Sequence, residues 1–184
     1  MSTCKRKPLN LGVVLLLGIA LICWACGYHV RGSIGRLPSG AQSLGVPTFR
    51  NLTNQYRIEQ LISSAVIKEF SLRTRVPVNS SSSGVDCVLL GEIKNVSSVP
   101  VAFSTQQGQT LASAFLVTVQ ISIKLKRLKD DAIIWQNQDF QYRERYALNA
   151  SVQDFFSEEN PALQRLAQNF AASLVSTILE QSKP

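Results

Sequence analysis

The sequence is poor in the residues that most often build catalytic and metal sites. Histidine occurs once in 184 residues, at position 29, and cysteine occurs four times. His29 has no second histidine or free thiol with which to share a zinc ion. The chain also lacks a nucleophile elbow and a glycine-rich phosphate loop. The sequence therefore predicts no catalytic residue, no metal and no cofactor, and argues against an enzyme.

Charge is also sparse. Charged residues make up 17% of the chain, and 19 Lys and Arg outnumber 12 Asp and Glu, giving a net charge of +7. Three of these cations, Lys5, Arg6 and Lys7, lie in the first ten residues, so 16 against 12, or +4, remain without them. This weak, scattered excess has no accompanying base-stacking motif, which argues against nucleic-acid binding. It is compatible with another anionic partner.

The longest apolar run is too short for a typical membrane span. Residues 11–25 carry no charge and follow the basic cluster. They would form a helix of about 22 Å, whereas a bilayer core of about 30 Å needs about 20 residues. The pattern favours an export signal. A single-span membrane anchor is the alternative.

The end of this run resembles the lipoprotein box of bacterial signal peptides. Ala25 stands directly before Cys26, although Cys23 and Trp24 depart from the usual box. The resemblance implies cleavage before Cys26, which carries diacylglyceryl and N-acyl lipid, and Gly27 favours sorting to the outer membrane. Two or more acyl chains give stable membrane attachment. We therefore expect a signal peptide at 1–25, a lipidated tether at 26–43 and one domain at 44–184.

The remaining cysteine is expected to be structural. Removal of the signal and lipidation of Cys26 leave Cys87 as the one thiol of the mature chain, so no internal disulfide can form. Cys87 alternates with Val85, Leu89 and Ile93 on one face of a predicted strand. This pattern predicts a small, buried apolar side chain.

Hydrophobic periodicity predicts an α+β domain. Helical spacing predicts an amphipathic helix at 55–72, capped by Asn54 or Thr53, and a second one that Asn160 caps and Pro161 begins. Alternation predicts strands at 44–49, 85–96, 115–126 and 133–146, with a loop at 77–84, a turn within 96–108 and a bulge between Trp135 and Phe140. We expect a two-layer sandwich in which both helices cover one face of a mainly antiparallel four-stranded sheet.

The other face of this sheet is expected to be polar and partly basic. It would carry Thr118, Gln120, Ser122, Lys124 and Lys126, with Arg143 and Arg145 from the returning strand. The residues Lys124, Lys126, Arg127 and Lys129 cluster at one end of the hairpin, beside apolar Leu128. Such cations can bind the phosphates of an anionic amphiphile. A solvated sheet face is the alternative interpretation.

Two motifs and their order resemble a known family. CGYHVRG at 26–32 and LGVPTFRNLT at 44–53 precede the amphipathic helix, the long hairpin and the C-terminal helix. Together they resemble the LptE family of lipopolysaccharide-assembly lipoproteins, across 26–184. The resemblance implies two helices on a four-stranded sheet. It also implies a lipid anchor in the outer membrane on its periplasmic side, and a position as a plug inside the LptD β-barrel.

The resemblance further implies that the pair inserts lipopolysaccharide into the outer leaflet and that the lipoprotein binds lipopolysaccharide through basic residues. The candidates in this sequence are Lys124, Lys126, Arg127, Lys129, Arg143 and Arg145. The resemblance assigns no particular family lysine or arginine to Lys124, Lys126 or Arg143. The serine loop at 80–83 and the lipid box depart from the family pattern. A generic outer-membrane lipoprotein scaffold for another envelope assembly is the alternative function. A periplasmic hydrolase is a third class, which would need a nucleophile with a partner base.

Overall fold

The computed structural model describes residues 35–106, 109–147 and 161–181, all within the unit Ile34–Pro184. The expected signal peptide, Cys26 and Asn160 lie outside the described residues. The elements, in chain order, are η1 (Pro38–Gly40), β1 (Leu44–Gly45), β2 (Arg50–Asn51), α2 (Ile58–Arg73), β3 (Val78–Asn79), β4 (Cys87–Gln106), β5 (Gln109–Arg127), β6 (Ile133–Ala147) and α4 (Pro161–Gln181).

The sheet is mixed and has six strands, in the order β3-β1-β4-β5-β6, with β2 beside β4. The long strands β4, β5 and β6 form an antiparallel meander, whereas β1, β2 and β3 pair in parallel. The expected α+β class is correct, but the four-stranded, mainly antiparallel sheet is not. The sequence analysis missed the short strands because two residues are too few to show alternation. Pro47 also separates the predicted strand at 44–49 into β1 and, beyond it, β2.

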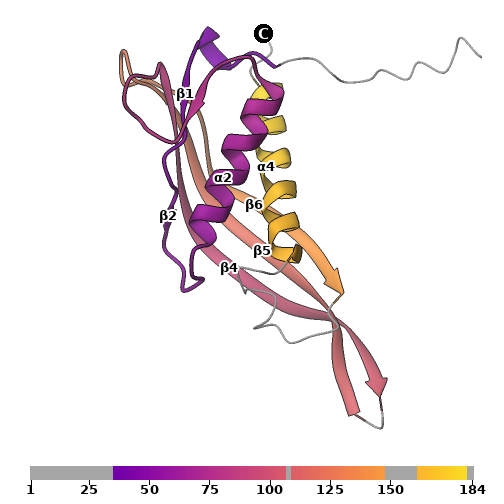
Figure 1. The fold of residues 1–184 in the computed structure, drawn as a ribbon. Coiled ribbons are helices and arrows are strands. Elements are labelled where there is room, and N and C mark those ends of the chain that lie inside the picture. Colours follow the sequence, from indigo (N-terminus) through magenta and orange to yellow (C-terminus); the bar gives the residue numbers. More distant parts are fainter. Residues whose placement is uncertain (1–34, 107–108, 148–160, 182–184) are drawn as a thin grey trace, which may run out of the picture. The chain divides into compact units, whose positions relative to one another are not determined.

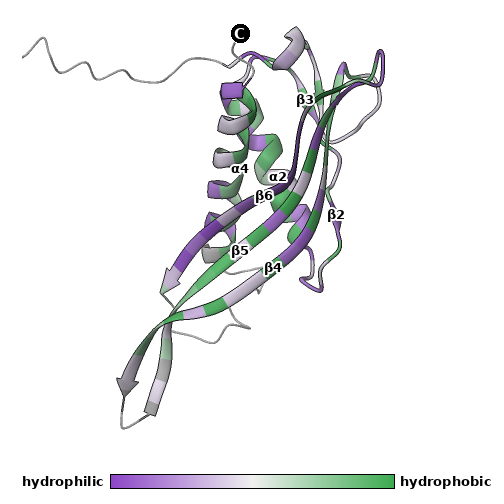
Figure 2. Ribbon diagram, turned by 180° about the vertical axis from the view of Figure 1, so that it is seen from behind, coloured by the Kyte–Doolittle hydropathy of each residue, from purple (hydrophilic) through white to green (hydrophobic). Residues whose placement is uncertain are grey.

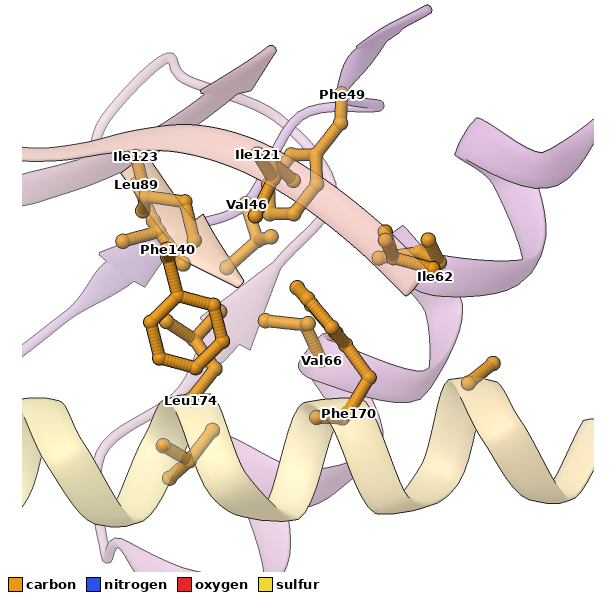
Figure 3. Packing of buried hydrophobic residues seen from close by; sticks show 14 of the residues in the cluster. Val46, Phe49, Ile62, Val66, Leu89, Ile121, Ile123, Phe140, Phe170 and Leu174 are labelled. Carbon is orange, nitrogen blue, oxygen red and sulfur yellow. The ribbon is translucent and has the colours of Figure 1, made fainter. Parts of the chain in front are cut away.

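Both helices cover the same face of the sheet, as expected (Figure 1). The apolar stripe of α4 is buried throughout, and Phe170 packs edge-on against Phe140 and Tyr142, with ring centroids 5.6 and 6.0 Å apart. From α2, Ile62 and Val66 enter the same cluster (Figure 3). Cys87 is buried in this core as a free thiol, which confirms its predicted structural placement. One apolar layer between the helices and the sheet therefore supports the fold.

The predicted turn within 96–108 falls at the end of that range: β4 continues to Gln106, which pairs with Gln109 of antiparallel β5, so the chain reverses between them. The strand predicted to end at Val96 is therefore longer than expected. Pro100 lies inside this strand, and the β4–β5 register shifts near it, between Pro100 and Ala102 and again between Ala102 and Phe103. Proline is tolerated on edge strands and at bulges. Pairing between β2 and β4 ends at Ile93. Beyond that residue, β4 pairs only with β5 within the described residues and is therefore an edge strand. Pro100 therefore marks an irregularity within β4, whereas Gln106 marks its end.

The bulge expected in β6 is confirmed. Ile121 pairs with Phe140 and Ile123 with Asn137, so β6 holds one more residue than β5 in this interval. The extra residue shifts the alternation of β6, which places Trp135 and Phe140 on the helix-covered face although five positions separate them. A bulge of this kind re-aims side chains without interrupting the sheet.

Candidate functional site

The face of the sheet opposite the helices is polar, as predicted, and we call it the outer face. On β5 it carries half-buried Thr118, Gln120 and Ser122 and exposed Lys124. Arg143 pairs in register with Thr118, and Arg145 with Leu116, which places both arginines on this face. Figure 2 views the molecule from this side. The outer face is the surface on which an anionic ligand would find the predicted cations.

Two of the four cations near the β5–β6 turn, Lys126 and Arg127, are paired with acids of the turn itself. Lys126 Nζ lies 2.7 Å from Asp131 Oδ2. Arg127 donates from Nε to Asp130 Oδ1 at 2.8 Å and from Nη2 to Oδ2 at 2.7 Å. These hydrogen bonds hold the pKa of the Asp130 carboxyl below its usual range and raise the pKa of Arg127. Both pairs are partly solvated, so they position the turn more than they stabilise the fold.

Lys124 and Lys129 have no ion-pair partner within the described ranges, and both are exposed. Lys124 lies directly across from Leu90, an apolar side chain that is 43% exposed. A free cation beside exposed apolar surface is the combination that an anionic amphiphile requires. Among the four turn cations, Lys124 therefore has the most suitable surroundings for a lipid phosphate on the outer face.

Arg143 and Arg145 do not join this group. Arg143 pairs with Thr118 of β5, and Thr118 is six residues from Lys124 on the same strand. At about 3.3 Å per residue this separation is about 20 Å. Arg143 Nη2 donates to Gln141 Oε1 at 2.9 Å, and Gln141 Nε2 donates to Asp139 Oδ2 at 3.1 Å. The six predicted basic residues thus form two separate groups rather than one site.

A further cation, Lys94, was not identified from the sequence. Its Nζ donates to the carbonyl oxygen of Gln138 at 2.8 Å, so the side chain crosses β5 to reach β6. Two residues earlier in β4, Glu92 Oε1 lies 3.5 Å from Arg50 Nη1. Lys94 stands at a register shift of β4, between Ile93 and Asn95, where strand alternation gives no guide to its direction.

The other prominent surface is a projecting arm, defined as residues 99–106 of β4 and 109–115 of β5. It extends past both helices and past the end of β6, whose last residue, Ala147, pairs with Ala114 (Figure 1). Val99, Val101 and Phe103 on the arm are 49%, 44% and 63% exposed. Exposed apolar residues gathered on one projection mark an interaction surface.

A simple sequence signal accompanies the arm. Residues 95–123 contain no Asp, Glu, Lys, Arg or His. Fully buried parts of interfaces are depleted in charge and enriched in aromatic residues. Hydrophobic periodicity indicates only strands and a turn in this region, so it does not reveal the surface that this charge-free run marks.

The motif at 44–53 is structural. Phe49 is buried, and its N–H donates to Ser63 Oγ at 2.9 Å. Asn51 organises the turn that follows: its Nδ2 donates to the Gln55 carbonyl at 2.8 Å and to Glu59 Oε2 at 2.9 Å. The predicted caps do not start α2; instead Arg57, in the left-handed conformation with φ 56°, precedes Ile58 without a side-chain cap. The motif therefore builds the entry to α2.

Two further features can be stated for the described residues. Residues 35–106, 109–147 and 161–181 hold no group of three or more His, Cys, Asp or Glu side chains suited to a metal ion. In the same ranges, neither helix combines the length and the apolar character that crossing a membrane requires. Cys26 and His29 lie outside these ranges.

Comparison with solved structures shows the fold. The PelC dodecamer from Paraburkholderia phytofirmans is 12% identical, with a TM-score of 0.50, and the match covers 79% of this chain and 94% of that chain. Protein XCC0632 from Xanthomonas campestris is 11% identical, with a TM-score of 0.51 and coverage of 78% and 87%. The hypothetical protein CT253 from Chlamydia trachomatis is 7% identical, with a TM-score of 0.51 and coverage of 76% and 96%.

Comparison of sequences identifies the family. No curated protein matches the chain. The family model described as "LptE: Lipopolysaccharide-assembly" matches residues 41–178, which include every described helix and strand from β1 to most of α4. The resemblance stated from the two motifs is thereby confirmed, and the chain belongs to the LptE lipopolysaccharide-assembly family.

Proposed function

We propose that this chain is a non-catalytic outer-membrane lipoprotein that plugs an LptD-type β-barrel and helps to insert lipopolysaccharide into the outer leaflet. Lipid on Cys26 anchors it on the periplasmic side of the membrane. Membership of the lipopolysaccharide-assembly family supports this role. The observation that carries the proposal is the arm, which combines exposed apolar side chains with a charge-free sequence.

The composition of the arm suits a confined, polar lumen. The interior of a large outer-membrane barrel is polar. A charged group enclosed there would lose its hydration and would need a partner of opposite charge. The arm instead offers Ser and Thr side chains beside Val99, Val101 and Phe103. These groups can hydrogen-bond or pack against the barrel wall without the cost of burying charge.

The size of the arm is also suitable. Residues 99–106 of β4 span about 26 Å at about 3.3 Å per residue, close to the apolar band of about 25 Å around outer-membrane barrels. The arm lies at the opposite end of β4 from Cys87, which pairs with β1 near the start of the described chain. A domain tethered at the periplasmic side would thus extend its arm into the lumen.

The test is co-purification of the tagged, membrane-extracted protein with its barrel. In an arm variant, Val101→Lys with Phe103→Lys, we expect the stoichiometric barrel to be lost. The matched control is Leu52→Lys with Leu72→Lys, which charges two side chains of similar exposure, 51% and 70%, outside the arm. Circular dichroism and thermal unfolding verify that both variants fold.

Equal barrel recovery in both variants would reject the arm as the plug contact. If the unsubstituted protein elutes with other envelope proteins and no barrel, the generic lipoprotein scaffold becomes the better interpretation. Lipopolysaccharide binding is the second part of the proposal. Of the predicted residues Lys124, Lys126, Arg127, Lys129, Arg143 and Arg145, Lys124 has the free charge and the apolar neighbour that favour it.

A further inference from the structure

The point at which the tether enters the domain is fixed. Gly35 N donates to the Arg73 carbonyl at 2.9 Å, and Gly35 forms a parallel bridge with Thr74 at the end of α2. A Cβ at Gly35 would stand 2.6 Å from Leu179 Cδ1, so glycine allows the chain to lie against α4. The segment from Cys26 therefore meets the domain where α2 and α4 both end.

The β5–β6 turn lies at this same end. The Leu128 N–H donates to the Asp86 carbonyl at 2.9 Å, while Asp86 Oδ2 accepts from the Gln42 N–H at 2.8 Å. We call this end the tether end, formed by residues 35–42, 73–76 and 127–132. The arm lies at the opposite end of the long strands (Figure 1).

The tether end presents cations to solvent. Arg75 and Lys129 are exposed, and neither has an ion-pair partner within the described part of the chain. Arg75 also lines an open hollow of about 460 Å³, together with Arg36 and the apolar side chains of Leu37 and Val76. The nearby acids Asp130 and Asp131 are engaged by Arg127 and Lys126. Asp86 is an exposed acid at this end, and within the described residues its carboxylate accepts only the backbone N–H of Gln42, so the two exposed cations Arg75 and Lys129 outnumber it.

The tether is too short to keep this surface far from a membrane. Even fully extended, the chain from Cys26 to Gly35 reaches about 30 Å. Cations close to an anionic bilayer are attracted to it, and the attraction decays within a Debye length of about 10 Å. We propose that, before the domain enters a barrel, its tether end docks on anionic phospholipid headgroups through Arg75 and Lys129, which orients the arm away from the membrane surface.

This inference rests on the lipid anchor of the proposed function. It also assigns Lys129 to phospholipid rather than to lipopolysaccharide. The exposed cations Arg143 and Arg145 provide a comparison, because they lie on the outer face near the far end of β6. If headgroup docking depends on position, removing these two charges should not affect it.

The test uses the mature lipidated protein in vesicles. A fluorophore is attached at Ser82→Cys, an exposed position in the loop before Asp86, and in a second sample at Thr105→Cys on the arm. Quenching by headgroup spin-labelled lipid is measured in vesicles of phosphatidylcholine alone and with about 30% phosphatidylglycerol added, which supplies an anionic surface. We expect added phosphatidylglycerol to increase quenching at Ser82→Cys and not at Thr105→Cys.

Removal of the two cations should abolish this effect. Arg75→Gln with Lys129→Gln is expected to lower the equilibrium constant for docking by roughly fivefold for each cation removed. Arg143→Gln with Arg145→Gln should leave this constant unchanged. The inference is overturned if quenching at Ser82→Cys does not respond to phosphatidylglycerol. It is also overturned if Arg75→Gln with Lys129→Gln leaves that response unchanged. If the Arg75→Gln, Lys129→Gln variant no longer co-purifies with the barrel but shows unchanged quenching, these cations contact an acidic rim of the barrel instead of phospholipid. Failure of the protein to float with any vesicle would overturn the Cys26 anchor itself.

Discussion

The ring of Phe49 lies directly on the backbone of Gly91. A Cβ built at Gly91 would stand 2.8 Å from Phe49 Cγ and Cδ2, closer than side chains approach one another in folded proteins. Phe49 belongs to the motif that indicated the family, and Gly91 lies in β4. Glycine at position 91 therefore makes room for the aromatic residue that closes the core beside β2.

We expect Gly91→Ala to destabilise the domain by about 1–3 kcal/mol, because the added methyl group overpacks the site. Urea denaturation measures the change. In a Phe49→Leu background the ring is absent, so the same substitution should cost much less. If the two substitutions instead lower the free energy of unfolding additively, the contact does not constrain Gly91.

Asn51→Ala should destabilise the start of α2. The Asn51 side chain makes four hydrogen bonds, donating to Gln55 and Glu59 and accepting from the N–H and hydroxyl of Thr53. Their loss is expected to cost about 1–2 kcal/mol in the free energy of unfolding. The control is Asn54→Ala, which alters an exposed neighbour. Equal denaturation midpoints for both variants would contradict the role of Asn51.

Stability should fall at alkaline pH because of two tyrosines. Burial, with a hydrogen bond from the hydroxyl to Glu144 Oε2 at 2.9 Å, raises the pKa of Tyr142 from 10.0 to about 12. Burial also raises the pKa of Tyr146. Because the unfolded phenols ionise first, this stabilisation is complete below pH 10 and is lost as the pH rises from 10 towards 12.

Urea unfolding between about pH 9 and 12 measures this loss. Tyr142→Phe should reduce the slope of stability against pH, and adding Tyr146→Phe should reduce it further. A slope that the two substitutions leave unchanged would assign the alkaline transition to other groups. Absorbance of the ionised phenols gives an independent titration of the folded protein.

Lys124→Glu should weaken lipopolysaccharide binding by at least about tenfold, since a charge-assisted hydrogen bond is replaced by repulsion. Fluorescence anisotropy with labelled lipopolysaccharide measures the affinity. Arg143→Glu changes the same charge at a side chain already held by Gln141, and it should have a smaller effect. Unchanged binding by the folded Lys124→Glu variant would remove Lys124 from the site.

Periodicity predicted the long elements well because they bury one face over many residues. The α2 and α4 stripes, the bulge of β6 and buried Cys87 all follow from spacing alone. The short parallel strands β1, β2 and β3 could not be predicted, since long-range pairing creates them and two residues hold no periodic signal. The ion pairs of Asp130 with Arg127 and of Asp131 with Lys126 could not be predicted either, because they depend on the geometry of the turn.

The irregular edge of β4 affects how this chain can pair with copies of itself. A long, uncharged, apolar strand edge is a template for aggregation. In the arm, Pro100 lacks a backbone donor, and the register shifts around Ala102 interrupt the regular spacing of hydrogen-bonding groups. These features oppose edge-to-edge pairing between copies while leaving the side chains of Val101 and Phe103 available. The arm thus exposes apolar side chains without offering other copies of the chain a regular strand edge with which to pair.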